Sequence, residues 1–199
     1  MSEPAVDLAV ILAGGLSRRM GADKAGISLA GRPLVAHVAE RIAPQARRLM
    51  VNAPAGTDLP YPLLPDTLPD RPGPLAGILA AMRHAESLGA AKVLTVPVDT
   101  PFLPRDLAER LATASTGDTI AVASSGGRIH PVAALWPAAL ASDLETWLAE
   151  PDHRRLTDFL ARHPVVGVDF ALDPVDPFFN VNTPDDLARA ETLLTELHP

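Results

Sequence analysis

LAVILAGGLSRRMGADK, residues 8–24, joins a short apolar run to a glycine pair and then to a basic cluster. The run from Leu8 to Leu12 predicts a buried strand. Gly14 and Gly15 let the backbone turn sharply and approach a ligand closely, so that successive N–H groups can converge on an anion. Full positive charges follow the turn, on Arg18, Arg19 and Lys24. The stretch therefore predicts a strand that leads into a phosphate-binding loop.

Two familiar phosphate-binding motifs do not match this loop. A Walker A loop requires glycine followed directly by lysine and a hydroxyl residue, but Gly21 is separated from Lys24 by two residues, and Ala25 stands in the hydroxyl position. A dinucleotide fingerprint requires the spacing G-x-G-x-x-G, which the adjacent pair Gly14-Gly15 does not have. The loop therefore belongs to another nucleotide-binding class.

The composition is that of an ordinary soluble globular protein, with 47% hydrophobic and 21% charged residues in a chain of 199. A net charge of −7 argues against general nucleic-acid binding, which normally requires a basic face. Cysteine is absent, so disulfides, thiolate metal sites and a cysteine nucleophile are excluded. The N-terminus has no export signal, and no apolar run approaches the ~20 residues of a membrane span. We therefore expect a cytoplasmic enzyme or binding protein without a membrane or nucleic-acid partner.

Apolar runs alternate with helical patterns along the chain, which predicts an α/β fold with a mostly parallel sheet and helices on both faces. We expect one domain over residues 1–199, since no long linker or internal repeat is present. The expected strands are 8–12, 49–52, 92–98, 119–123, 132–136 and 165–170, with a short one near Leu63. The expected helices are 34–43, 75–88, 103–114, 138–149 and 154–162. A last helix begins at Thr183-Pro184, where a hydroxyl cap is followed by proline and two acids.

Ligands of open α/β sheets bind at the carboxyl ends of the strands, and several polar residues are expected there. Asp99 follows the strand 92–98, where its carboxylate suits Mg²⁺; the alternative is that Asp99 starts a turn or caps the next helix. Asn52 ends the second strand, and its alternative is an Asx turn. Asn180 and Asn182 point to the same side of an extended segment, as ligand contacts or as a structural brace.

The residues of these segments resemble the molybdenum cofactor guanylyltransferase family. Its pattern LAGG-x-S-x-R-M-G-x-D-K is matched at every specified position of residues 12–24. Further matches are the PGPLAG run at 72–77, the H-P pair at 130–131, the paired arginines at 154–155 and the N-x-N-T-P motif at 180–184. The resemblance covers residues 10 to 186 and implies a single Rossmann-like nucleotidyltransferase domain.

The resemblance also implies a role for each matching residue. It assigns the nucleotide to Leu12, Ala13, Gly14, Gly15, Lys24, Asn52, Asp70 and Asp99, with Asp66 as a weaker candidate. It assigns catalysis to Arg19, Lys24 and Asp99, of which Asp99 is the Mg²⁺ ligand, whereas Arg18 is spare. It assigns the pterin to Asn180, Asn182, His130, Arg154 and Arg155. For His130 the alternative is a structural role, for the arginine pair a solvated surface, and for Phe178-Phe179 we expect core packing.

The implied reaction is transfer of GMP from GTP to molybdopterin in its metal-bound form, with release of pyrophosphate. Molybdoenzymes or cofactor-delivery proteins are candidate partners. The related cytidylyltransferase has LAAG where this chain has LAGG, so Gly14 is the position that favours GTP. Alternatives are a nucleotidyltransferase that uses CTP or another phosphate acceptor, such as a sugar phosphate, and a regulatory or carrier subunit that binds nucleotide without turnover.

Overall fold

A computed structural model describes residues 3–14, 16–17, 22–68, 73–150 and 155–197. Its centre is a six-stranded sheet with the order β10-β8-β9-β7-β1-β6. The strands are β1 (Val6–Leu12), β6 (Ala46–Asn52), β7 (Lys92–Pro97), β8 (Ile120–Ser125), β9 (Arg128–Pro137) and β10 (Val165–Phe170). All run in one direction except β9, which is antiparallel to β7 and β8.

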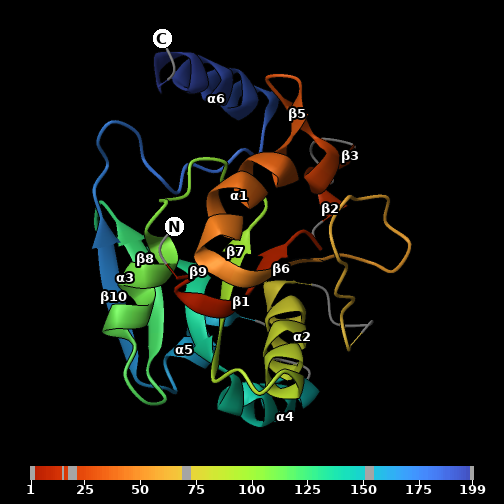
Figure 1. Ribbon diagram of the computed structural model, residues 1–199, viewed down its shortest axis with the longest axis vertical. Coiled ribbons are helices and arrows are strands. Elements are labelled where there is room, and N and C mark those ends of the chain that lie inside the picture. Colours follow the sequence, from red (N-terminus) through yellow and green to blue (C-terminus); the bar gives the residue numbers. More distant parts are fainter. Residues whose placement is uncertain (1–2, 15, 18–21, 69–72, 151–154, 198–199) are drawn as a thin grey trace.

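Helices cover both faces of the sheet, as Figure 1 shows. One face packs against α1 (Leu34–Ile42) and α3 (Leu107–Ala114), and the other against α2 (Pro74–Ser87), α4 (Ala141–Ala149) and α5 (Leu156–Leu160). In β1 the side chains of Ala9 and Ile11 join the first core, whereas Leu8 and Val10 join the second. A strand buried on both faces has a continuous apolar run. The predicted α/β fold, with a mostly parallel sheet and helices on both faces, is confirmed.

A smaller third core holds the chain near the carboxyl end of β7. It lies between α6 (Pro184–Leu197) and the hairpin of β4 (Ser28–Leu29) and β5 (Arg32–Pro33), and it contains Ile27, Leu29, Leu34, Phe102, Val181 and Ala190. Phe102 comes three residues after Asp99 in the sequence, and Val181 lies between Asn180 and Asn182. This core therefore fixes both polar segments from the side opposite to the sheet.

Two very short strands after β1 pair with each other in antiparallel fashion. They are β2 (Leu16–Ser17) and β3 (Ala22–Asp23), with Leu16 paired to Asp23, and a 3₁₀ turn over Lys24–Gly26 follows. Other 3₁₀ turns are Ala43–Gln45, directly after α1, and Ala138–Leu140, directly before α4. The glycine turn is thus followed by a β-ribbon.

The helix expected over residues 103–114 begins four residues later, at Leu107. Gln45 explains this start, because its Oε1 accepts the Ala108 N–H at 2.8 Å and so caps the helix. The Gln45 Nε2 donates to the carbonyls of Pro104 at 2.9 Å and Arg41 at 2.8 Å. A cap from a residue 63 positions away leaves no local signal in the sequence.

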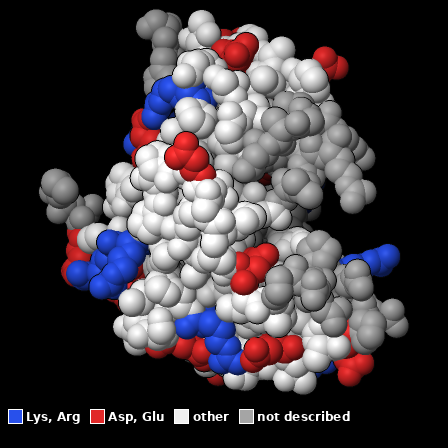
Figure 2. Space-filling model, turned by 90° about the vertical axis from the view of Figure 1, so that its right-hand side faces the viewer, with Lys and Arg blue, Asp and Glu red and all other residues white. Residues whose placement is uncertain are grey.

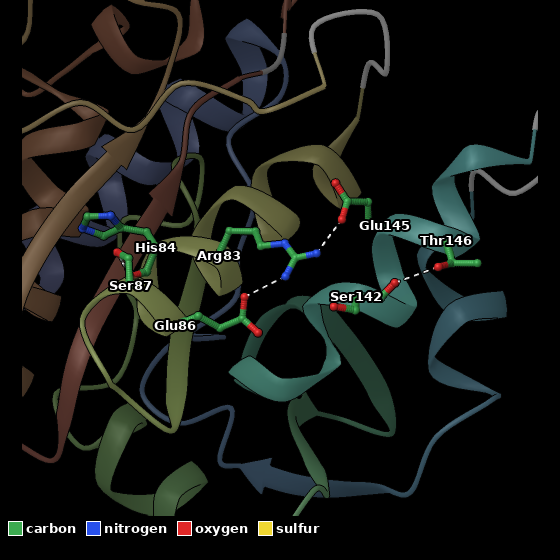
Figure 3. A network of polar contacts seen from close by, with 7 residues as sticks. All are labelled: Arg83, His84, Glu86, Ser87, Ser142, Glu145 and Thr146. Carbon is green, nitrogen blue, oxygen red and sulfur yellow. Dashed lines mark hydrogen bonds and ion pairs between the residues drawn. The ribbon is translucent and has the colours of Figure 1, made fainter.

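An ion-pair network joins α2 to α4 at the surface. Arg83 donates to Glu86 on its own helix and to Glu145 on α4, as Figure 3 shows. The side chain of Arg83 is 33% exposed and that of Glu145 is 51% exposed, and such pairs contribute about 1 kcal/mol or less to stability. The contact between the two helices therefore depends on apolar side chains such as Met82 and Leu144, both fully buried in the same core.

Candidate active site

A cleft of about 230 Å³ opens where β1 and β7 end. Its walls are Leu12, Gly14, Gly73, Pro74, Pro97, Val98, Asp99 and Val132. Figure 2 views the side of the molecule on which β2 and β3 lie in Figure 1. The described Lys and Arg side chains stand near the edges of this view. The cleft lies at the carboxyl ends of the parallel strands, where the sequence predicted the ligand site.

Asp99 lies at the rim of this cleft, where a backbone hydrogen bond to a distant segment holds it. Its residue is 9% exposed, and its carbonyl accepts the Val181 N–H at 2.9 Å. The bond joins the segment after β7 to the N-x-N segment near the end of the chain. Asp99 is not the cap of α3, since that helix begins eight residues later and its N-terminal N–H of Ala108 is capped by Gln45.

The N-x-N segment presents its two asparagines away from the third core. Val181 is fully buried in that core, whereas Asn180 and Asn182 are half-buried. Neighbouring side chains of an extended segment alternate in direction, so the two asparagines share the opposite side.

The Thr183-Pro184 part of the motif is a helix cap. Asp186 Oδ2 accepts the N–H groups of Asn182 at 3.0 Å and Thr183 at 2.9 Å, while Thr183 Oγ1 accepts the Asp186 N–H at 3.1 Å. Reciprocal bonds of this kind form a capping box. The backbone bond from Asn182 and the Thr183 hydroxyl lower the pKa of Asp186. The predicted start of the last helix is confirmed, because α6 begins at Pro184.

Asn52 has a fixed amide orientation beneath the cleft. It is 3% exposed, and its Nδ2 donates to the Leu64 carbonyl at 2.9 Å and to Asp66 Oδ1 at 2.8 Å. These bonds span 12 and 14 residues, so Asn52 does not form the Asx turn that was its alternative. With both donors used, the Asn52 Oδ1 is turned toward Gly14 and Gly77: a Cβ on Gly14 would lie 3.4 Å from it.

Asp66 therefore helps to hold the Asn52 amide in this orientation. If the nucleotide is the GTP that the resemblance implies, we expect Asp66→Ala to raise its KM about threefold to tenfold with little change in kcat, because one hydrogen bond of Asn52 is lost while that to Leu64 remains. Steady-state kinetics measure this split, with Asp58→Ala as the matched control because Asp58 is exposed on the same loop. An unchanged KM with reduced kcat would instead place Asp66 in the chemical step.

The N-terminus of α2 forms the wall opposite Asp99. Gly73 caps this 14-residue helix with φ at +121°, a value that only glycine adopts readily, and Pro74 occupies the first turn. Both residues line the cleft. The N-terminus of a helix carries a partial positive charge and free N–H groups, so this wall favours an anion.

His130 does not line the cleft in the part of the chain that the structure describes. Its ring stacks on Phe178 with centroids 4.3 Å apart, and its Nε2 lies 2.8 Å from Ser125 Oγ, which donates to Asp176 Oδ1 at 3.0 Å. Phe178 belongs to the core on the α1 and α3 face, whereas Val132 of the cleft packs on the α2 face. The contacts favour a structural role for His130, and its contact with a pterin stays a prediction.

The stability of the fold should depend on pH through His130. Burial of the ring lowers its pKa below 6.5, Arg128 lowers it further, and Asp176 opposes both. As the pH falls through 6.5, the His130 imidazole takes up a proton in the unfolded chain before it does so in the folded chain. The free energy of unfolding that His130 contributes above this pH is therefore lost. We expect the difference in free energy of unfolding between the protein and His130→Gln to shrink from about pH 8 to about pH 5.5 in urea titrations. A difference that stays constant over this range would contradict the lowered pKa.

Arg155 lies on the opposite face of the sheet from the contact of His130 with Phe178. It is exposed at the start of α5, whose Leu156 and Phe159 pack into the core on the α2 face. The remaining predicted residues Gly15, Arg18, Arg19, Asp70 and Arg154 lie outside the described residues, as does the side chain of Lys24. The structure thus brings together Leu12, Gly14 and Asp99 in the cleft, with Ala13, Asn52, Asn180 and Asn182 beside it.

Comparison with known proteins decides the family. The model of the MobA-like NTP transferase domain matches residues 9–166. The chain belongs to this family. The molybdenum cofactor guanylyltransferase of Rhizobium meliloti (strain 1021) is 52% identical over 201 residues, covering 95% of this chain and 92% of that protein. The protein of the same name from Cereibacter sphaeroides is 50% identical over 190 residues, covering 93% and 95%. The resemblance read from the motifs is confirmed.

Solved structures agree with the MobA-like fold. Molybdopterin-guanine dinucleotide biosynthesis protein A from Archaeoglobus fulgidus superposes with a TM-score of 0.75 at 26% identity, covering 95% of this chain and 99% of that one. The 2-C-methyl-D-erythritol 4-phosphate cytidylyltransferase from Thermus thermophilus has a TM-score of 0.65 at 22% identity, covering 96% and 98%, and shares the fold. The sheet of this MobA-like protein is therefore that of a nucleotidyltransferase.

The oxygen donors of this MobA-like domain fit a Mg²⁺ ion whose coordination shell is completed by the substrate. Within the described ranges no group of three or more His, Cys, Asp or Glu could enclose a metal ion. Asp99 supplies a carboxylate at the cleft, and Mg²⁺ takes one or two carboxylates and fills its shell with water and substrate phosphates. Zn²⁺ in a structural site needs four protein ligands. The described residues also include no helix long and apolar enough to cross a membrane.

Gly77 lies beside the site of this MobA-like domain, and no role was predicted for it beyond its place in the PGPLAG run. A Cβ on it would lie 2.4 Å from Asn52 Oδ1, so only glycine lets α2 approach β6 at this point. Gly77 ends the PGPLAG run, and a glycine inside an otherwise good helix was the available signal. Val132 and Pro97 were also missed, and they offer no signal because they are ordinary apolar strand residues.

Proposed function

We propose that this chain transfers GMP from GTP to molybdopterin in its metal-bound form, which yields the guanine dinucleotide cofactor and pyrophosphate. The observation that carries the proposal is a cleft lined by Gly14, by Gly73 and Pro74 at the N-terminus of α2, and by Asp99. Two relatives that share about half of their residues with this chain, both named molybdenum cofactor guanylyltransferase, support the choice of nucleotide and acceptor.

Positioning and charge neutralisation are the main contributions of the chain to this reaction. The N–H groups at the start of α2 and the backbone at Gly14 bind phosphate oxygens. Arg19 and Lys24 neutralise the triphosphate and then the departing pyrophosphate. Mg²⁺ held by Asp99 supplies further neutralisation of phosphate charge when it is bound. Asn180 and Asn182 lie on the segment bonded to Asp99 and orient the acceptor.

No strong general base is needed at this site. The acceptor is a phosphomonoester, whose second pKa is about 6, so it is largely dianionic near pH 7 and already nucleophilic. Its oxygen attacks the α-phosphorus of GTP in line while the bond to the pyrophosphate oxygen breaks. Among the described cleft residues Asp99 is the titratable one, in agreement with a transfer that requires no proton abstraction by the protein.

Gly14 controls the choice of base in this proposal. We expect Gly14→Ala to lower kcat/KM for GTP about tenfold and to spare CTP, because the added methyl group would stand 3.4 Å from Asn52 Oδ1 and narrow the space for a purine. Initial rates of pyrophosphate release with each nucleotide measure this effect. Gly26→Ala is the control, since its added Cβ meets nothing within 4 Å. An equal loss with both nucleotides would remove the role of Gly14 in selectivity.

The second candidate is transfer to a sugar or alditol phosphate, because the fold is shared with a cytidylyltransferase of an erythritol phosphate. Pyrophosphate release is measured with GTP, CTP and ATP against metal-bound molybdopterin, metal-free molybdopterin, mannose 1-phosphate and methylerythritol phosphate. We expect release with GTP and the metal-bound pterin. Turnover with a sugar or alditol phosphate and none with either pterin would establish the second candidate instead.

A further inference from the structure

A second cavity, of about 390 Å³, lies on the α1 and α3 face of the molecule and is larger than the candidate active-site cleft. It is enclosed by the end of α1, the segment after Phe102, the first turn of α3, the segment 170–177 and the end of α6. Three arginines line it, Arg41, Arg105 and Arg110. None of these arginines takes part in the function proposed above.

Arg41 carries a charge that the described part of the protein does not neutralise by contact. Its residue is half-buried, and burial together with the neighbouring Arg105 lowers its pKa, while Glu40 opposes both. The Glu40 carboxylate instead pairs with Arg32 at 2.8 Å and with Arg105 at 3.7 Å. Among the described residues no ion pair or hydrogen bond is formed by the Arg41 guanidinium. A half-buried cation without a contact partner favours the binding of an anion from outside.

Arg110 is held in place at the cavity, whereas Arg105 is an exposed side chain at its border. The Arg110 guanidinium lies 4.0 Å from the ring centre of Phe170, and its Nη2 donates to the Asp169 carbonyl at 2.7 Å. Arg105 and Arg41 also line an adjoining cavity of about 260 Å³, so their side chains stand between the two spaces. A ligand would therefore meet one basic group, Arg110, that is already oriented, and two others that border both spaces.

The carboxylates at the cavity do not cancel this charge. Asp106 lies 4.0 Å from Arg110, and Asp173 is the other acidic residue of the lining. Three guanidinium groups and two carboxylates thus line the cavity, and the Glu40 carboxylate near Arg105 is shared with Arg32 outside it. The other lining residues are apolar: Pro104, Pro174, Val175 and Leu197 are among them, while Phe102 and Phe170 lie almost fully buried beneath the surface. Such a cavity matches a ligand with an anionic end and an apolar body.

We propose that this cavity is a binding site for a small phosphate ester, with its phosphate on Arg41 and Arg105 and its organic part against Pro104, Pro174 and Val175. Guanidinium groups bind phosphate through paired N–H donors, which a single ammonium group does not offer. A volume of about 390 Å³ is within the range of small-molecule sites. The site is separate from the candidate active site, because the two cavities share no lining residue.

The test is a calorimetric titration of the full chain with phenyl phosphate, in the presence of GTP and without acceptor so that the active-site cleft is filled. We expect Arg41→Gln to weaken phenyl phosphate at least about tenfold, the effect of one lost charge-assisted hydrogen bond. The affinity of Arg41→Lys for phenyl phosphate should lie between those of the unaltered protein and Arg41→Gln. Lysine keeps the positive charge but lacks the paired N–H donors of a guanidinium group. Arg48→Gln, at an exposed position on β6, is the control and should bind like the unaltered protein.

Three results would overturn the proposal. They are an unaltered protein that does not bind phenyl phosphate, an Arg41→Gln variant that binds it equally well, and inorganic phosphate that binds as tightly as the ester. Without ligand, Arg41→Gln should unfold at the same temperature as the unaltered protein or a higher one, which shows that lost binding is not lost folding. GTP binding, titrated separately, should be unchanged in Arg41→Gln, so the failure of this site and of the proposed function are distinguishable.

Discussion

Asp99→Asn should reduce kcat for guanylyl transfer by about 100-fold to 1000-fold while the fold remains intact. The substitution keeps the shape of the side chain and removes the negative charge at the rim of the cleft, where the proposed Mg²⁺ ligand is needed. The backbone bond from Val181 to the carbonyl of residue 99 does not depend on the side chain. Single-turnover rates of pyrophosphate release with saturating GTP and molybdopterin measure the effect, and the unfolding midpoint checks the fold.

The control for this substitution is Asp58→Asn, which changes the same group at an exposed position away from the cleft lining. It should retain the full rate. A full rate in Asp99→Asn would remove this residue from the chemical step. The same experiment tests the alternative of a carrier subunit, since a protein that only binds nucleotide has no pyrophosphate release to lose.

Gly77→Ala should destabilise the protein by about 2–3 kcal/mol, as overpacking of a filled interior typically does. The new Cβ would lie 2.4 Å from Asn52 Oδ1, 3.0 Å from Asn52 Cγ and 3.2 Å from Leu12 Cδ2. Asn52 cannot turn aside without losing its bonds to Leu64 and Asp66. Either the amide or the start of α2 must shift, so the KM for GTP should rise as well.

Urea unfolding of Gly77→Ala and of Gly167→Ala separates this contact from the general effect of a glycine replacement. Gly167 lies in β10, and a Cβ added there meets nothing within 4 Å. Gly167→Ala should be neutral or slightly stabilising, since alanine restricts the unfolded chain. Equal stability of the two variants would show that α2 and β6 are not as tightly packed as the structure has them.

The layers of the fold were predictable because each buried strand leaves a continuous apolar run. Leu8 to Leu12 and Lys92 to Val98 were found for this reason, and β1 and β7 end where expected to within one residue. The direction of β9 is not encoded in such a run. The turn between β8 and β9 is formed by Gly126 and Gly127, both with positive φ, and a glycine pair between two strands indicates a hairpin. That signal was present in the sequence and was not used.

The candidate site was predictable only where the chemistry is carried by consecutive residues. The glycine turn and the aspartate after a strand are local patterns, and the structure places Gly14 and Asp99 in one cleft. The contacts that orient the site are distant in sequence: Asn52 with Asp66, Asp99 with Val181, and Gln45 with Ala108. Tertiary packing decides which residues meet in this way, and a single sequence does not carry that information.

The cavity that Arg41 lines was not predicted, because the segments that line it are distant from one another in the sequence. Its arginines come from the end of α1, the segment before α3 and α3 itself, and each of them taken alone resembles a solvated surface residue. Only their convergence with Pro104, Pro174 and Val175 around one cavity indicates a ligand site.

The identity of the nucleotide transferred tests the proposed function most directly. The purified chain is given metal-bound molybdopterin, Mg²⁺ and equal concentrations of GTP and CTP, and the dinucleotide products are separated and counted by mass spectrometry over the initial time course. We predict the guanine dinucleotide in about tenfold excess or more, the discrimination that a methyl-sized difference at Gly14 supports, with one pyrophosphate released per dinucleotide. Formation of the cytosine dinucleotide at an equal or greater rate would contradict guanylyl transfer as the function of this chain.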